Sequence, residues 1–213
     1  MAYRLGVVAV VYGGMDPEVA VDLAIEDGYD HIDGSIDWTG TYKLPIGDRV
    51  AFPGPRPGCS TPAAYDQPGM WERSVAAFRR AVAGTTPDQS PVRMEPWAGS
   101  ICNSTETIKA MLEAVPGLRL LVDTGHVADW GGDPLEILEF ADHVQLRDGL
   151  PGQTEAWPGE GDVDFKRVID HLRSIDYPGL LSIEYFNLPE QGWPLDDPRA
   201  HAAALRGMVR PLL

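Results

Sequence analysis

Two patterns of apolar and polar residues alternate along this chain. Short, nearly continuous apolar runs, typical of buried strands, are separated by segments in which apolar residues recur every three or four positions, as on one face of a helix. This alternation is typical of a parallel sheet covered by helices. The expected strands are 4–12, 29–36, 90–96, 118–123, 142–148 and 179–186, and the expected helices are 17–28, 70–84, 104–115, 133–141, 164–175 and 197–213.

Polar residues with short side chains precede several of the expected helices. Asp16 and Asp133 each stand directly before a proline, and Ser104 or Thr105 and Asp164 precede the amphipathic segments that follow them. Such residues accept hydrogen bonds from the free N–H groups of a first helical turn. They predict where these helices begin.

The alternation fails between residues 38 and 69, which are dense in proline and glycine and hold at most one expected strand, 43–52. A segment of that length without regular structure is unusual inside a compact domain. The total is about seven strands. We therefore expect a TIM-type (β/α) barrel of the α/β class, compact and missing or distorting one β/α unit in residues 38–69. Since no interior stretch resembles a linker, residues 1–213 are expected to form a single domain.

The composition narrows the functional classes. The chain has 32 acidic and 17 basic residues, a net charge of −15, and no basic patch, so nucleic acid and anionic membranes are not expected partners. The apolar run near the N-terminus is too short to span a bilayer and lacks a signal-cleavage pattern, which favours a cytoplasmic protein. Cys59 and Cys102 lack metal-type spacing, and free thiols are expected in a reducing compartment.

Four successive strands in the second half end in a side chain that can bind a metal ion. These residues are Glu95, Asp123, Gln145 and Glu184. In a parallel barrel the reacting groups lie at the carboxyl ends of the strands, and a buried carboxylate is costly unless something binds it. Three carboxylates and an amide form an oxygen-rich site suited to one divalent ion such as Mn²⁺, Mg²⁺, Co²⁺ or Zn²⁺. A helix cap or surface ion pair is the alternative for each residue taken alone.

Several motifs together resemble the sugar phosphate isomerase/epimerase family with a xylose-isomerase-like TIM barrel. They are EPWAG, VDTGH, HVQLRD, GEGDVDF, Tyr177-Pro178-Gly179 and LSIEY. The resemblance is close over residues 91–187 and loose over the first third. In that family Glu, Asp, His and Glu from consecutive strands hold a divalent ion, which implies Glu95, Asp123, Gln145 and Glu184 here.

The third of these positions departs from the family pattern. Relatives commonly have an HVHLKD-like strand with a histidine where this chain has Gln145. His143 cannot simply replace it, because two residues along a strand span about 6.6 Å and place His143 one layer deeper. An amide oxygen favours Mn²⁺ over softer ions, so Mn²⁺ is the expected metal. An amide is also a poorer ligand, which leaves open a degenerate barrel that binds sugar without turnover.

Other residues are candidates for substrate binding. His126 could bind the metal, hydrogen-bond the substrate or shuttle a proton, and Arg147 could bind the substrate unless it neutralises the acidic site. Five tryptophans follow expected strands and suggest an aromatic-walled pocket, although they could instead cover the barrel or form a subunit contact. The residues expected to bind substrate are His126, Arg147, Trp97, Trp130, Trp157 and Glu160.

The resemblance implies a sugar, sugar phosphate or polyol isomerase or epimerase that acts on a small carbohydrate. Glu95 and Glu184 are the expected catalytic base and acid, exchanging a proton through a metal-stabilised enediolate. A C-glycoside deglycosidase or lyase on the same barrel is the enzymatic alternative. The endonuclease branch needs more histidines and a basic face, and both are missing. Oligomeric state is open, although such proteins often form homodimers.

Overall fold

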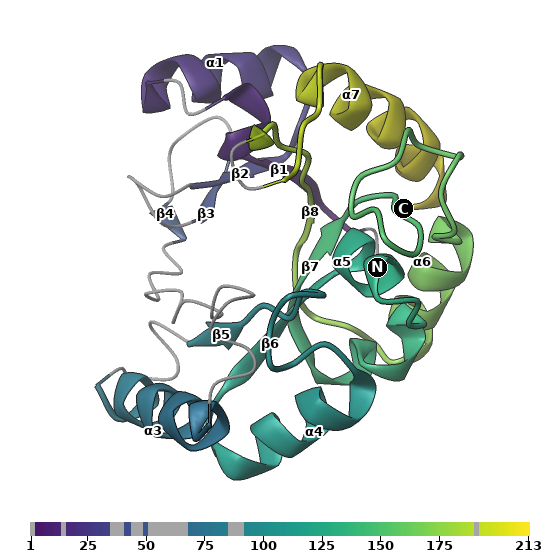
Figure 1. Cartoon of the computed structure of the whole chain (residues 1–213). Helices are drawn as coiled ribbons and strands as arrows, with labels where there is room; N and C mark the ends of the chain where they lie inside the picture. The colour runs from purple at the N-terminus through teal and green to yellow at the C-terminus, as the bar shows by residue number, and fades with distance from the viewer. Residues whose placement is uncertain are drawn as a thin grey trace.

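A computed structural model describes residues 3–13, 16–34, 41–43, 49–50, 68–84, 92–189 and 192–213, with only the backbone for 41–43 and 49–50. All described strands belong to one sheet in the order β4-β3-β2-β1-β8-β7-β6-β5. The sheet is curved, and the long helices cover its outer face (Figure 1). The expected TIM-type α/β fold is therefore confirmed.

Six strands run parallel, and a short antiparallel hairpin extends the sheet beyond β2. The first strand lies in the middle, since β1 pairs with β2 on one side and with β8 on the other. β3 pairs antiparallel with β2, and β4 pairs antiparallel with β3. The strands are β1 (Leu5–Val8), β2 (His31–Asp33), β3 (Thr41–Lys43), β4 (Arg49–Val50), β5 (Arg93–Met94), β6 (Arg119–Asp123), β7 (Ala141–Leu146) and β8 (Leu181–Ile183).

Helices connect the parallel strands, and the predicted caps open several of them. Asp16 accepts a hydrogen bond from the Glu18 N–H, Ser104 from Thr107 and Asp164 from Arg167. The α-helices are α1 (Pro17–Glu26), α3 (Met70–Ala83), α4 (Thr105–Ala114), α5 (Thr124–Asp129), α6 (Phe165–Ser174) and α7 (Pro198–Val209). The 3₁₀ helices are η1 (Ala9–Tyr12), η2 (Pro134–Glu136), η3 (Leu138–Phe140) and η5 (Arg210–Leu212).

Three predictions about these elements were wrong. The strand expected at 4–12 ends at Val8, and residues 9–12 form η1. The single strand expected at 43–52 is replaced by β3 and β4, which pair with each other, and residues 44–48 between them lie outside the described part. The helix expected at 133–141 is two 3₁₀ turns, η2 and η3. Asp133 caps the first of these turns, but Ile137 leaves helical geometry with φ −127°, so the two turns do not join.

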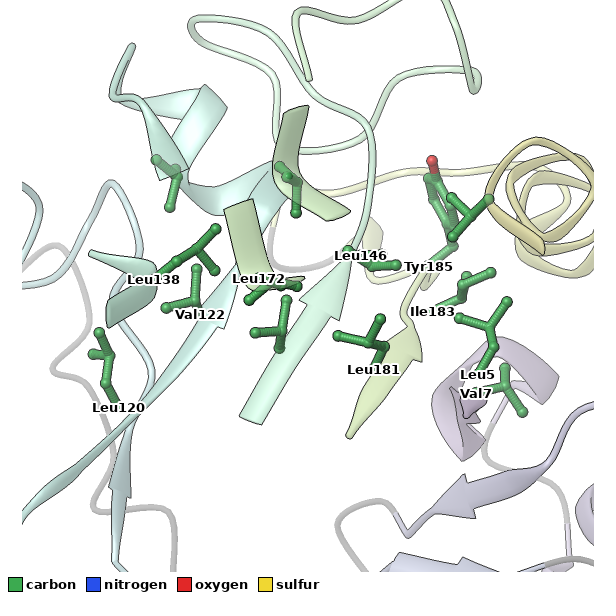
Figure 2. Close-up of a cluster of buried hydrophobic side chains, with 14 of the residues drawn as sticks. Leu5, Val7, Leu120, Val122, Leu138, Leu146, Leu172, Leu181, Ile183 and Tyr185 are labelled. Atoms are coloured by element: carbon green, nitrogen blue, oxygen red, sulfur yellow. The ribbon is translucent and has the colours of Figure 1, made fainter. Parts of the chain in front are cut away.

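The hydrophobic core lies between the sheet and its helices. Buried strand residues such as Leu120, Val122, Leu181 and Ile183 pack together with Leu172 of α6 (Figure 2). Burying an aliphatic side chain of this size contributes about 1.5–3 kcal/mol, so this layer fixes how the strands lie. No helix in the described part is both long and apolar enough to cross a bilayer.

Candidate functional site

The four predicted metal ligands lie at the carboxyl ends of neighbouring strands. Asp123 is the last residue of β6 and pairs with Gln145 of β7, while Glu95 and Glu184 follow the ends of β5 and β8. Asp123, Gln145 and Glu184 are buried, and Glu95 is partly exposed. Since β5, β6, β7 and β8 are consecutive in the sheet, all four side chains belong to one edge.

The Gln145 amide lies between two of the carboxylates. In the orientation that satisfies its hydrogen bonds, its nitrogen donates to Glu184 Oε2 and to Glu95 Oε1, each at 3.1 Å. Glu184 Oε2 and Glu95 Oε1 therefore share one hydrogen-bond donor, the Gln145 amide nitrogen, and lie on either side of it. Turning the amide over presents its oxygen to the same space, so Gln145 can donate to the carboxylates or offer an oxygen ligand.

His126 joins the same cluster through the short helix α5, which the sequence patterns did not predict. Asp123 begins this helix because its Oδ1 accepts the N–H groups of Gly125 (2.8 Å) and His126 (3.1 Å). Ligand atoms of Glu95, Asp123 and His126 all lie within 4.8 Å of one another. Burial lowers the pKa of His126, which favours the neutral imidazole that binds metals.

Arg147 lies behind these carboxylates and is fully buried. Its Nε and Nη2 donate to Asp123, its Nη1 lies 3.2 Å from Glu155 Oε1, and its Nη2 lies 3.5 Å from Glu184 Oε2. Burial alone lowers the pKa of Arg147, but these carboxylates raise it above the ordinary value. Of the two predicted roles, the geometry favours neutralising the acidic site over direct contact with substrate.

Two residues that matter for this arrangement were not predicted. Glu155, from the loop after β7, pairs with Arg147 and accepts the Phe186 N–H at 2.8 Å. Phe186 in turn lies against the guanidinium, 4.4 Å from ring centroid to Cζ. Nothing in the local sequence marks Glu155 as buried, because loop glutamates are usually exposed.

Of the three tryptophans expected to bind substrate, Trp97 joins an aromatic group that reaches His126. The ring of Trp193 contacts those of Trp97, Phe186 and His126, with centroids 5.7, 5.5 and 6.1 Å apart. Trp193 is one of the five tryptophans that follow expected strands, but it was not among the residues expected to bind substrate. Trp130 packs against the core, and exposed Trp157 lies against His201. Glu160 is exposed on the same loop as Trp157. Substrate binding by Trp130, Trp157 and Glu160 stays a prediction.

A second polar layer lies one step deeper in the barrel. His143 Nε2 lies 2.9 Å from Asp33 Oδ2, which also accepts the Ser182 hydroxyl at 2.5 Å, and His31 Nε2 lies 3.0 Å from that hydroxyl. Burial opposes ionisation of Asp33, but His143 lowers its pKa below the ordinary value. His143 is thus engaged two residues below Gln145, as expected from its position in the strand.

The residues present fit a divalent cation. Arg147 supplies one positive charge against the carboxylates of Asp123, Glu155 and Glu184, and Glu95 adds a fourth carboxylate. The excess of negative charge and the oxygen-rich donors suit a hard or borderline ion. Nδ1 of His126 is buried and has no hydrogen-bond partner among the described residues, so the imidazole retains a donor or acceptor position.

Comparison with known proteins agrees with this arrangement. The family model described as "Xylose isomerase-like TIM barrel" matches residues 22–209, so the chain belongs to that family. The fold and the strand-end carboxylates thus define the class of protein to which the chain belongs, and the predicted family resemblance is confirmed.

Individual relatives in this class include an inosose dehydratase from Lactiplantibacillus plantarum, 31% identical over 114 residues. The match covers 43% of this chain and 38% of the dehydratase, so it spans about two fifths of that relative. Among solved structures, an L-ribulose 3-epimerase has a TM-score of 0.72 at 14% identity, covering 100% of this chain and 95% of the other. A D-psicose 3-epimerase from Clostridium cellulolyticum H10, with D-tagatose, has a TM-score of 0.72 at 13% identity, covering 99% of each chain.

Proposed function

We propose that this protein is a divalent-metal-dependent isomerase or epimerase of a small carbohydrate: a sugar, sugar phosphate or polyol. The single observation that carries the proposal is the position of the Gln145 amide, 3.1 Å from carboxylate oxygens of both Glu95 and Glu184. Two carboxylates on either side of a common space are what proton exchange at one carbon requires. The epimerase structures with a similar fold add support.

Glu95, Asp123, Gln145 and Glu184 would hold the ion, with His126 beside them. When bound, such an ion supplies Lewis-acid polarisation of a carbonyl oxygen and makes the neighbouring C–H acidic. Mn²⁺ is the preferred ion, because an amide oxygen and carboxylates suit it better than softer metals.

The two glutamates perform the proton exchange. One carboxylate removes the proton from the carbon next to the carbonyl, and the electron pair of that C–H bond moves toward the carbonyl. The other glutamate, in its protonated acid form, returns a proton to the opposite face of the same carbon, which inverts that carbon. Alternatively it protonates the former carbonyl carbon while the hydroxyl proton of the first carbon moves to the former carbonyl oxygen, which isomerises the sugar. His126 orients a hydroxyl, and the ring of Trp193 restricts water on one side of the cluster.

Elemental analysis and solvent exchange test the proposal together. The wild type should retain about one equivalent of Mn²⁺ and incorporate deuterium from D₂O into one ketose of a panel of free and phosphorylated ketoses. Glu184→Gln should lose both properties. The matched control is Glu113→Gln, an exposed residue of α4, which should keep both. Deuterium incorporation that survives in Glu184→Gln contradicts the assignment.

Dehydration is a second candidate because the chain is 31% identical to an inosose dehydratase over 114 residues. The first step is the same proton removal, after which a hydroxyl on the next carbon takes a proton from the acidic glutamate and leaves as water. A product lighter by one water in the same assays, identified by mass spectrometry, decides for this candidate. Cleavage of an aryl C-glycoside in the panel would instead favour the deglycosidase alternative. Metal-free protein that binds a sugar tightly without turnover would favour the degenerate barrel.

A further inference from the structure

The hydrogen bonds around Asp123 leave one of its two oxygens for a cation. Oδ1 accepts from the N–H groups of Gly125 and His126 and from Arg147 Nε, at 2.8, 3.1 and 3.3 Å. A carboxylate has about four lone-pair sites on its two oxygens, so Oδ1 is fully used. Oδ2 is the remaining ligand atom, and Arg147 Nη2 donates to it.

The same guanidinium nitrogen also lies close to Glu184. Nη2 is 3.5 Å from Glu184 Oε2, the oxygen that accepts from the turned Gln145 amide. The Arg147 guanidinium therefore already places a positive charge between Asp123 and Glu184, where a metal ion would otherwise supply it. An ion bound by Asp123 Oδ2 and by the Glu184 carboxylate therefore lies close to the guanidinium, and the two cations repel each other.

Arg147 cannot move out into solvent to avoid this conflict. It is fully buried, its Nη1 is held by Glu155, and its guanidinium lies over the Phe186 ring. Glu155 is fixed in turn by the Phe186 N–H. The contact with Glu155 gives the guanidinium a second partner on which to remain when Nη2 releases Asp123.

We propose that Arg147 is a positioning residue that competes with the divalent ion for Asp123 and Glu184 and so weakens metal binding at this site. The inference rests on the proposed metal-dependent function. Arg147 holds the two carboxylates in place and is shifted toward Glu155 when an ion binds. Metal affinity is thus set by the arginine behind the ligands as well as by the ligands themselves.

The test compares Mn²⁺ affinity, measured by calorimetry, between wild type and the double variant Arg147→Met/Glu155→Gln. This variant removes one positive and one negative charge, so the net charge is unchanged and no unpaired Glu155 carboxylate remains. It should bind Mn²⁺ at least tenfold more tightly than wild type. Glu155→Gln alone is the matched control and should bind no more tightly, because it only makes the site less negative.

Arg147→Lys provides a second variant that keeps the charge. A single ammonium cannot reproduce the bonds of Nε and Nη2 to Asp123, so this variant should also bind Mn²⁺ more tightly than wild type. Mn²⁺ electron paramagnetic resonance on each protein reports the bound ion independently of turnover. Thermal unfolding without metal shows whether each variant is folded. If either Arg147→Met/Glu155→Gln or Arg147→Lys fails to fold, the Mn²⁺ affinity of the other one tests the inference.

The outcomes separate this inference from the proposed function. Tighter binding in the variants supports competition by Arg147, since damage to the fold would weaken binding. If wild type binds Mn²⁺ and the folded variants bind it equally or more weakly, the inference is overturned while the metal-dependent function stands. If neither wild type nor the folded variants bind Mn²⁺, both are overturned.

Discussion

Replacing Asp148 by Asn should destabilise the loop that carries Glu155. Asp148 is buried directly after Arg147, and its carboxylate accepts four backbone N–H groups. Oδ1 accepts from Gly149 (3.0 Å) and Val163 (3.3 Å), and Oδ2 accepts from Gly159 (2.8 Å) and Gly161 (3.1 Å). This one carboxylate therefore ties both ends of the loop together.

An asparagine keeps the shape of Asp148 but has only one accepting oxygen. In either orientation of the amide, two of the four N–H groups face an NH₂ group. Each hydrogen bond to a charged group contributes about 1.5–3 kcal/mol, and burying a neutral amide offsets part of the loss. The expected decrease in the free energy of unfolding is about 3 kcal/mol.

Urea unfolding monitored by tryptophan fluorescence measures this change, with the m-value as a check that unfolding stays two-state. Asp164→Asn is the matched control, because Asp164 caps α6 from the same loop and Asn caps a helix about as well as Asp. It should change stability by less than about 0.5 kcal/mol. The reasoning fails if Asp148→Asn is no more destabilising than this control.

Three further outcomes are expected. Gln145→His should increase affinity for Zn²⁺ relative to Mn²⁺ by at least about tenfold in competition titrations, because imidazole suits the softer ion. Gly6→Ala should lower the free energy of unfolding by about 1–3 kcal/mol in urea melts, because its Cβ would lie 2.2 Å from the His31 ring. Burial lowers the pKa of His31 below 6.5, so the unfolded state binds more protons as the pH falls from about 7 to 5, and wild-type stability should decrease over that range. His31→Gln should flatten this part of the stability profile.

The positions of the candidate ligands at the strand ends could be predicted, because a buried strand has a simple sequence pattern. An apolar run that ends in a polar residue places that residue at the sheet edge, and parallel strands share their carboxyl edge. This pattern predicts that Glu95, Asp123, Gln145 and Glu184 lie together at one edge of the sheet, as they do. The caps of α1, α4 and α6 followed equally directly, because each depends on hydrogen bonds within one helical turn.

Contacts between distant segments could not be predicted in the same way. The role of Arg147 depends on Glu155 and Phe186, which come from two different loops and meet only after the sheet has formed. Residues 124–129 contain a glycine and no clear helical period, yet α5 forms there because the Asp123 side chain satisfies its first N–H groups. The local sequence pattern indicates which residues lie at the carboxyl edge of the sheet. Contacts between distant segments determine which partners each of these side chains has.

The central position of β1 has a consequence for how this protein folds. Leu5 pairs with Leu181 and Val7 with Ile183, so the earliest described strand and the last one are hydrogen-bonded neighbours. During synthesis β1 can pair with β2, but its other edge has no partner until residues near 183 leave the ribosome. Such distant pairings make folding slow, and an apolar edge exposed meanwhile is open to aggregation. We therefore expect the chain to depend on chaperones more than a helical protein of equal length.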